Sequence, residues 1–104
     1  MVVTPVDARG SVRRAVGRLE MLLGHDEQAD EHLRHAIDVN TKMRMPYWAA
    51  RAQLDYADFL VRRMRPGDVA LAHGQCLAAR DTSAHHGYGA LSRRASEILQ
   101  QIGV

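Results

Sequence analysis

Two histidines of this sequence lie one helical turn apart, beside acidic residues. His32 and His35 are three residues apart, and Asp38 follows after three more. On a helix this spacing places the side chains on one face, where imidazole and carboxylate groups could hold zinc. The sequence fixes no fourth ligand, and such pairs are also common on exposed helices. We therefore expect no metal and no cofactor; the alternative is a metal-binding, hydrolase-like protein that uses His32 and His35.

Other groups that could do chemistry have simpler interpretations. A general acid–base pair needs carboxylates or histidines held in a dry cleft, yet Asp55 and Asp58 alternate with arginines on a face that the pattern predicts to be solvated. His85 and His86 precede a glycine, where a histidine can cap the end of a helix. Cys76, the single cysteine, has small apolar neighbours that predict a buried thiol. We therefore expect that this protein is not an enzyme.

Arginine dominates the basic residues, with 13 arginines against one lysine. The formal net charge is only +2, which is weak support for nucleic-acid binding even though the pI is about 9.1. Nucleic acid is therefore an unfavoured alternative. Its candidate residues are Arg62, Arg63, Arg65, Arg93 and Arg94.

These groups must be positioned by helices, because apolar residues recur at spacings of three and four along most of the chain. We expect five helices: residues 12–23, 27–41 and 46–64, a fourth between Asp68 and the His85–His86 pair, and a fifth that ends at Gly103. Ser11, Asp26 and Asp68 are the predicted N-caps.

The apolar rows predict which side chains are buried. Four of the five aromatic residues, Tyr47, Trp48, Tyr56 and Phe59, belong to the third helix and should pack against its neighbours, with Tyr47 partly exposed. The other members of the predicted apolar rows, in chain order, are Val12, Ala15, Val16, Leu19, Leu22, Leu23, Ala29, Leu33, Ala36, Ile37, Ala49, Ala52, Ala57, Leu60, Met64, Val69, Ala72, His73, Cys76, Ala79, Leu91, Ala95, Ile98, Leu99 and Ile102.

Shifting the chain by 43 residues superposes Gly24 on Gly67 and Ala29 on Ala72, which indicates an internal repeat of two helices. Val16-Gly17, Gly24, Ala29, Leu33 and Ala36 resemble, in order and spacing, the signature positions of tetratricopeptide repeats. Residues 50–87 are also similar to the C-terminal helical repeats of large bacterial signalling proteins, including LuxR-type ATPase regulators and nucleotide cyclases. The resemblance implies an all-α fold of antiparallel helix pairs.

The same resemblance implies a non-catalytic interaction or scaffold module of a bacterial signalling or transcription-control system. In such arrays the first helix of each pair lines the concave face, where arginines could hold an acidic peptide or a terminal carboxylate. The candidate partner-binding residues are Arg14, Arg18, Arg51, Asp55, Asp58 and Arg62. Self-association is a further expectation if the N-terminal side stays uncovered.

Length and composition favour one domain, with a flexible leader at residues 1–10 and a helical repeat domain at 11–104. The opening residues do not resemble a secretory signal, and no apolar run is long enough to span a bilayer. The sequence therefore predicts a cytoplasmic protein with no membrane partner.

Overall fold

All regular structure in the described part of the chain is helical. The computed structural model describes residues 14–16 and 18–103, of which 14–16 and 18–22 are helical and are followed by four longer helices. These are α2 (Asp26–Lys42), α3 (Pro46–Arg63), α4 (Asp68–His86) and α5 (Gly89–Ile102). The predicted leader at residues 1–10 and the predicted cap at Ser11 lie outside the described residues.

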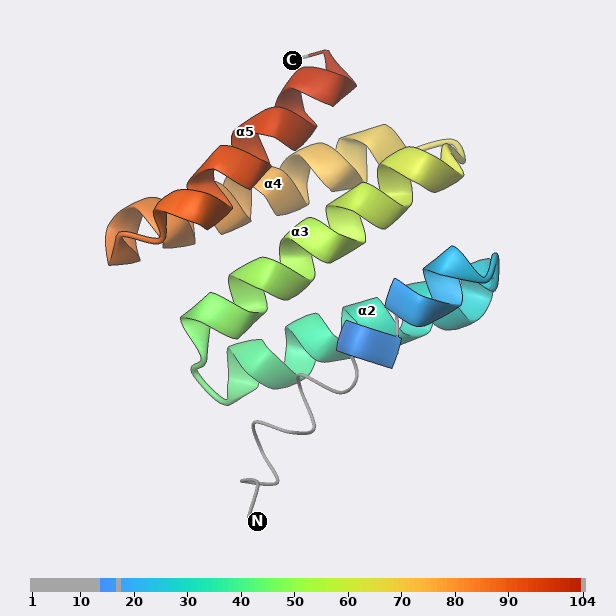
Figure 1. Cartoon of the computed structure of the whole chain (residues 1–104), viewed down its shortest axis with the longest axis horizontal. Helices are drawn as coiled ribbons and strands as arrows, with labels where there is room; N and C mark the ends of the chain where they lie inside the picture. The colour runs from blue at the N-terminus through green and yellow to red at the C-terminus, as the bar shows by residue number, and fades with distance from the viewer. Residues whose placement is uncertain (1–13, 17, 104) are drawn as a thin grey trace.

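The third helix of the chain, α3, holds the others together. It packs against α2 on one side and against α4 and α5 on the other, while α4 and α5 also pack against each other. Figure 1 shows α3 running between these neighbours, with the N-terminal helical residues lying alongside α2. Short turns join successive helices, so neighbours in sequence are neighbours in space.

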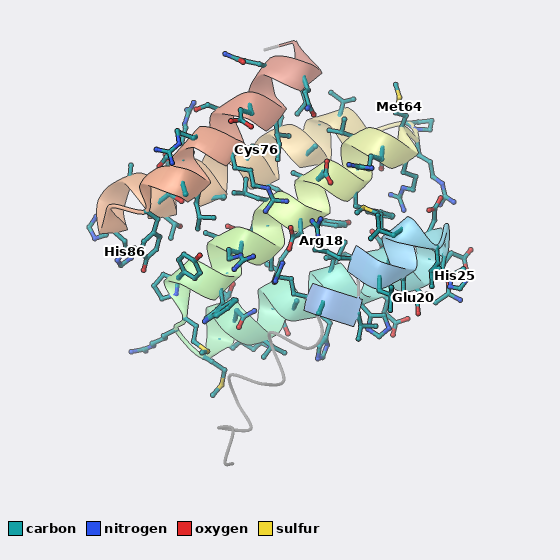
Figure 2. All side chains as sticks on the ribbon, viewed as in Figure 1. Arg18, Glu20, His25, Met64, Cys76 and His86 are labelled. Atoms are coloured by element: carbon teal, nitrogen blue, oxygen red, sulfur yellow. The ribbon has the colours of Figure 1, made fainter. Side chains whose placement is uncertain are left out.

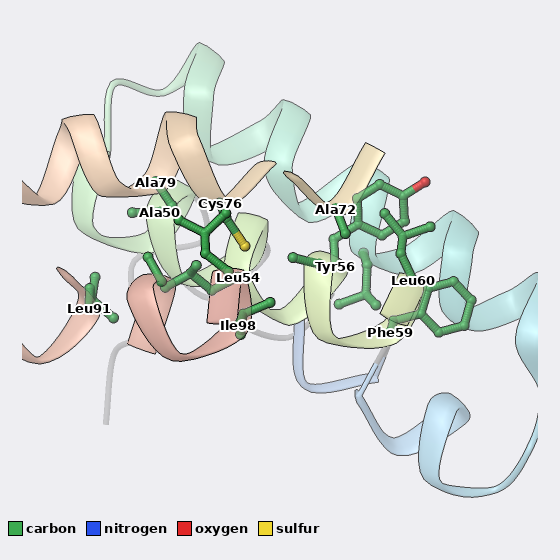
Figure 3. Close-up of a cluster of buried hydrophobic side chains, with 14 of the residues drawn as sticks. Ala50, Leu54, Tyr56, Phe59, Leu60, Ala72, Cys76, Ala79, Leu91 and Ile98 are labelled. Carbon is green, nitrogen blue, oxygen red and sulfur yellow. The ribbon is translucent and has the colours of Figure 1, made fainter. Parts of the chain in front are cut away.

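Small residues on the inward faces allow these helices to approach closely. Ala29 of α2, Ala57 of α3, Ala72 of α4 and Ala95 of α5 are all fully buried. Larger side chains fill the spaces beside them, among them Leu54, Tyr56, Phe59, Leu60, Cys76, Leu91 and Ile98 (Figure 3). Leu33 and Leu99 belong to the same cluster. The predicted burial is confirmed for Tyr56, Phe59 and most of the apolar rows of α2 and α5, namely Ala29, Leu33, Ala36, Leu91, Ala95, Ile98 and Leu99. Ile37 and Ile102, which belong to the same rows, are only half-buried.

The predicted N-caps at Asp26 and Asp68 are wrong by one residue. His25 and Gly67 occupy the N-cap positions, and neither helix has a side-chain cap hydrogen bond. Asp26 and Asp68 instead belong to the first helical turn, where a carboxylate still interacts favourably with the helix dipole. Pro46 is the first residue of α3, as predicted.

The end of α3 is set by an unusual backbone conformation. Met64 adopts a left-handed conformation, with φ of 56°, and its N–H donates to the carbonyl of Leu60. A residue with a Cβ is uncommon in this region of backbone space. Met64 belongs to the apolar row predicted for this helix, but it is 74% exposed at the end of α3 (Figure 2), so its predicted burial is wrong.

The N-terminal helical residues turn a different face inward from the one predicted. Leu19, Leu22 and Leu23 are 56%, 67% and 60% exposed, so their predicted burial is wrong. Arg14 and Arg18 point to the body of the protein because their guanidinium groups pair with a carboxylate on α3. These ion pairs fix the rotation of the helix and leave the leucine row at the surface.

The inward face of α4 is narrower than predicted. Ala72, Cys76 and Ala79 are fully buried, but Val69 is 47% exposed and His73 only half-buried. Residues 69 and 73 lie at the start of α4, near its turn with α3. The inward positions of α4 that are confirmed are therefore those with small side chains.

Candidate functional site

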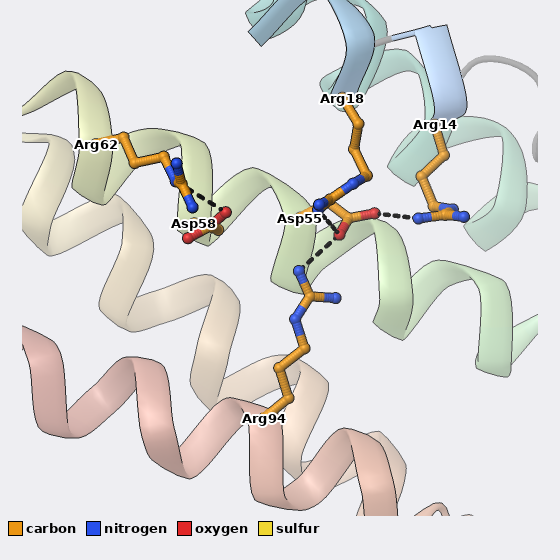
Figure 4. A network of polar contacts seen from close by, with 6 residues as sticks. All are labelled: Arg14, Arg18, Asp55, Asp58, Arg62 and Arg94. Carbon is orange, nitrogen blue, oxygen red and sulfur yellow. Dashed lines mark hydrogen bonds and ion pairs between the residues drawn. The ribbon is translucent and has the colours of Figure 1, made fainter. Parts of the chain in front are cut away.

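Asp55 is the centre of the most concentrated charge cluster in the described structure. Its side chain is fully buried in α3, and each of three guanidinium groups donates to its carboxylate (Figure 4). The donor nitrogens of Arg14 and Arg18 lie 2.6 Å and 2.8 Å from the carboxylate oxygens, and that of Arg94 lies 2.7 Å away. These short distances are typical of charge-assisted hydrogen bonds.

Three parts of the chain supply this cluster. Arg14 and Arg18 are one turn apart on the N-terminal helical segment, so both side chains reach the same point on α3. Arg94 comes from α5, between the buried residues Leu91 and Ala95. A buried carboxylate needs such partners because an unpaired charge is costly to remove from water.

The prediction that Asp55 lies on a solvated face is therefore wrong. Position 55 follows the buried Leu54 and precedes the buried Tyr56, so it lies on the inward side of α3 where arginines from neighbouring helices meet it. Both oxygens of this buried carboxylate are engaged by arginines of neighbouring helices.

Arg51 lies one turn before Asp55 and completes the cluster. Its guanidinium carbon is 5.4 Å from the ring centre of Trp48 and 5.8 Å from that of Tyr47, distances typical of cation–π contacts. Within the described residues, Arg51 has no carboxylate at ion-pair distance. In this part of the chain, the contacts given for the Arg51 guanidinium group are therefore with aromatic rings.

These residues line one hollow of about 580 Å³ in the surface. The apolar part of the lining comes from the exposed leucine row of the N-terminal segment. Four arginines and one aspartate give the lining a formal charge of +3. The lining residues are Arg14, Ala15, Arg18, Leu19, Leu22, Arg51, Asp55 and Arg94.

Four of the six predicted partner-binding residues meet in this hollow: Arg14, Arg18, Arg51 and Asp55. The other two, Asp58 and Arg62, pair with each other at 3.2 Å along the exposed part of α3 and do not line the hollow (Figure 4). Sequence reasoning did not assign Arg94 to this site. The available signal was its place beside the apolar row of α5, where an arginine can turn inward.

The residues considered for binding metal or nucleic acid do not form a second cluster of this kind in the described part of the chain. In the part of the chain that the structure describes, no three histidine, cysteine, aspartate or glutamate side chains gather closely enough to hold a metal ion. His32 and His35 are both half-buried on α2. Of the arginines considered for nucleic acid, Arg62, Arg63 and Arg94 are each engaged by a carboxylate.

A second polar network ties α2, α3 and α4 together on another side of α3. Arg63 donates through two nitrogens to the buried carboxylate of Asp68, each at 2.8 Å, and these hydrogen bonds hold the pKa of Asp68 below its usual value. The Tyr56 hydroxyl donates to Asp30 at 2.8 Å, and burial together with this bond raises the pKa of Tyr56 to about 12. Every member is paired within the fold, so the network has a structural role.

Two further sequence predictions concern single residues near α4. Cys76 is fully buried as predicted, and burial raises the pKa of its thiol to about 11 (Figure 2). His86 stacks on Tyr88 with ring centres 5.3 Å apart, and the ring of His85 meets that of His86 edge-on. At the end of α4, the His86 ring therefore contacts both the His85 ring and the Tyr88 ring.

Comparison with family models, curated proteins and solved structures finds no match to this chain. Among the described helices, none combines the length and the apolar character that crossing a membrane requires.

Proposed function

We propose that this chain is a non-catalytic interaction module that holds an acidic segment of a partner protein in the hollow around Asp55. The observation that carries the proposal is the convergence of Arg14, Arg18, Arg51 and Arg94 on one hollow that contains a single carboxylate. An uncompensated cluster of guanidinium groups attracts an anion, and arginine suits carboxylates because its planar group can donate two parallel hydrogen bonds.

The lining also suits a peptide better than a small free anion. Leu19 and Leu22 lie beside the arginines with more than half of each side chain exposed. Burying these surfaces under an apolar side chain of the partner would add to the free energy of binding. We therefore expect the bound segment to carry an acidic residue with a bulky apolar residue nearby.

The wider proposal is a tetratricopeptide-like arrangement in a bacterial signalling or transcription-control protein. It would pair the N-terminal helical segment with α2 and α3 with α4, as the repeat of small residues indicates. The first helix of each pair would then carry Arg14, Arg18, Arg51 and Asp55, which is the face that such arrays use for peptides.

A peptide-library experiment tests the acidic segment. The immobilised chain is incubated with two fluorescent degenerate nonapeptide libraries, one with glutamate fixed at the centre and one with glutamine. We expect retention of the glutamate library, and about fivefold weaker retention by an Arg51→Gln variant, because a partly exposed charge-assisted bond contributes about 1 kcal/mol.

The matched control is Arg93→Gln, which removes the same charge from an exposed position on α5 outside the hollow. Both variants are first compared with the parent by circular dichroism. Equal retention of the two libraries would contradict the proposal. Equal losses for the two variants would show that the attraction comes from general charge and not from the hollow.

A further inference from the structure

Asp55 leaves most of the hydrogen-bonding capacity of its arginines unused. Arg14, Arg18 and Arg94 each spend a single terminal nitrogen on the Asp55 carboxylate. A guanidinium group has five N–H donors. The buried Nε of Arg14 also has no acceptor among the described residues. The carboxylate therefore orients three guanidinium groups while it engages only one nitrogen of each.

The geometry of these donors differs from that of a two-pronged carboxylate clamp. Three guanidinium groups from the N-terminal segment and α5 surround one point on α3, and Arg51 approaches from one turn earlier on α3 (Figure 4 shows the first three). A planar carboxylate offers two oxygens in one plane. A tetrahedral phosphoryl group offers three oxygens in different directions, each able to accept from a different arginine.

The charge of the lining also favours a phosphoryl group over a carboxylate. The lining carries a formal charge of +3, from four arginines and one aspartate. One ligand carboxylate would reduce this to +2, whereas a phosphoryl group, which carries a charge of about −1.5 to −2 at neutral pH, would reduce it to about +1 to +1.5. Because the guanidinium groups repel one another at short range, the more highly charged ligand relieves more of that repulsion.

We infer that the preferred occupant of this hollow is a phosphorylated side chain in a segment of the partner protein. The inference rests on the proposed function, since it names the chemical group of the acidic segment. Arg14, Arg18 and Arg94, oriented by Asp55, hold the phosphoryl oxygens, and Arg51, held against Trp48, closes the site. Leu19 and Leu22 contact an apolar side chain beside the phosphorylated residue.

Three matched peptides and one free anion test this inference. The peptides are Ac-Leu-Gly-Xaa-Gly-Leu-NH₂ with phosphoserine, glutamate or serine at Xaa, and the free anion is inorganic phosphate. Each is titrated into the uniformly ¹⁵N-labelled chain, and the backbone and arginine Nε–Hε signals are followed by NMR. We expect the phosphoserine peptide to bind about fivefold or more tightly than the glutamate peptide, and the serine peptide to bind weakest.

Variants locate the site. Arg51→Gln leaves the three ion pairs of Asp55 in place and should weaken binding of the phosphoserine peptide about fivefold, whereas the matched Arg93→Gln change should weaken it less than about twofold. Equal affinity for the phosphoserine and glutamate peptides would overturn the phosphoryl inference and leave the proposed function standing. Tighter binding of inorganic phosphate than of the phosphoserine peptide would overturn a protein source for the group. Absence of binding by every probe would overturn both proposals.

Discussion

Replacing Asp55 by asparagine removes the carboxylate that three arginines share while keeping the size of the side chain. Among the described residues, the buried ion-pair cluster then has no acid left. Removing one partner from a fully buried pair costs about 3–5 kcal/mol, because the remaining charge stays uncompensated. Here the arginine side chains are 15%, 37% and 31% exposed and can turn toward water. We therefore expect a smaller loss, about 2 kcal/mol in the free energy of unfolding.

Thermal unfolding followed by circular dichroism measures this loss. For a domain of this size, about 2 kcal/mol lowers the melting temperature by about 8–16 °C. Asp58→Asn is the matched control, because Asp58 is on the same helix and its ion pair within the described structure is with the exposed Arg62. That change should cost less than about 1 kcal/mol. If the two variants melt at the same temperature, the reasoning that Asp55 organises the cluster is wrong.

Three further predictions concern the rest of the molecule. Because burial raises the pKa of Cys76 to about 11, the native thiol should react with iodoacetamide at pH 8 much more slowly than the same thiol in urea, and equal rates would contradict its burial. Tyr56→Phe removes the hydrogen bond to Asp30 and should lower the free energy of unfolding by about 1 kcal/mol, measured by urea unfolding. In the parent protein, ultraviolet absorbance should show Tyr56 ionising near pH 12. The stabilising effect of the raised pKa is therefore present below the ordinary tyrosine pKa of 10 and is lost as the pH rises toward 12. The hydrogen bonds from Arg63 lower the pKa of Asp68, so the Asp68 carboxylate stabilises the fold above the ordinary carboxyl pKa of 3.8, and this stabilisation is lost as the pH falls below that value. An Asp68→Asn variant should therefore lose less stability than the parent protein on acidification.

Apolar periodicity was sufficient to predict the helices but not the orientation of every one. The predicted ranges 27–41 and 46–64 differ from α2 and α3 by one residue at most at each end. In α5 every buried residue belongs to the predicted apolar row. In α2 the buried row also includes the polar residue Asn40, whose side-chain amide donates to the carbonyl of Ala36. In the N-terminal segment, by contrast, two arginines face inward and three leucines face outward.

The residues of the candidate site were also predictable only in part. The resemblance to helix-pair repeats predicted that Arg14, Arg18, Arg51 and Asp55 lie on one face, and these four residues do share the hollow. Spacing within one helix cannot show that Arg94, 39 residues after Asp55, completes the set. Nor can it show that Asp55 is buried, because the burial depends on three guanidinium groups whose positions are fixed only when the helices pack.

The ion pairs around Asp55 also bear on the order in which the molecule assembles. Most helix contacts join sequence neighbours, and contacts between neighbours form quickly because little chain entropy is lost in closing short loops. The bonds from Arg14, Arg18 and Arg94 to Asp55 instead close separations of 41, 37 and 39 residues. We expect the helix pairs to be native-like before these bonds form, so that the charged hollow appears late in folding and a partly folded chain does not yet display it.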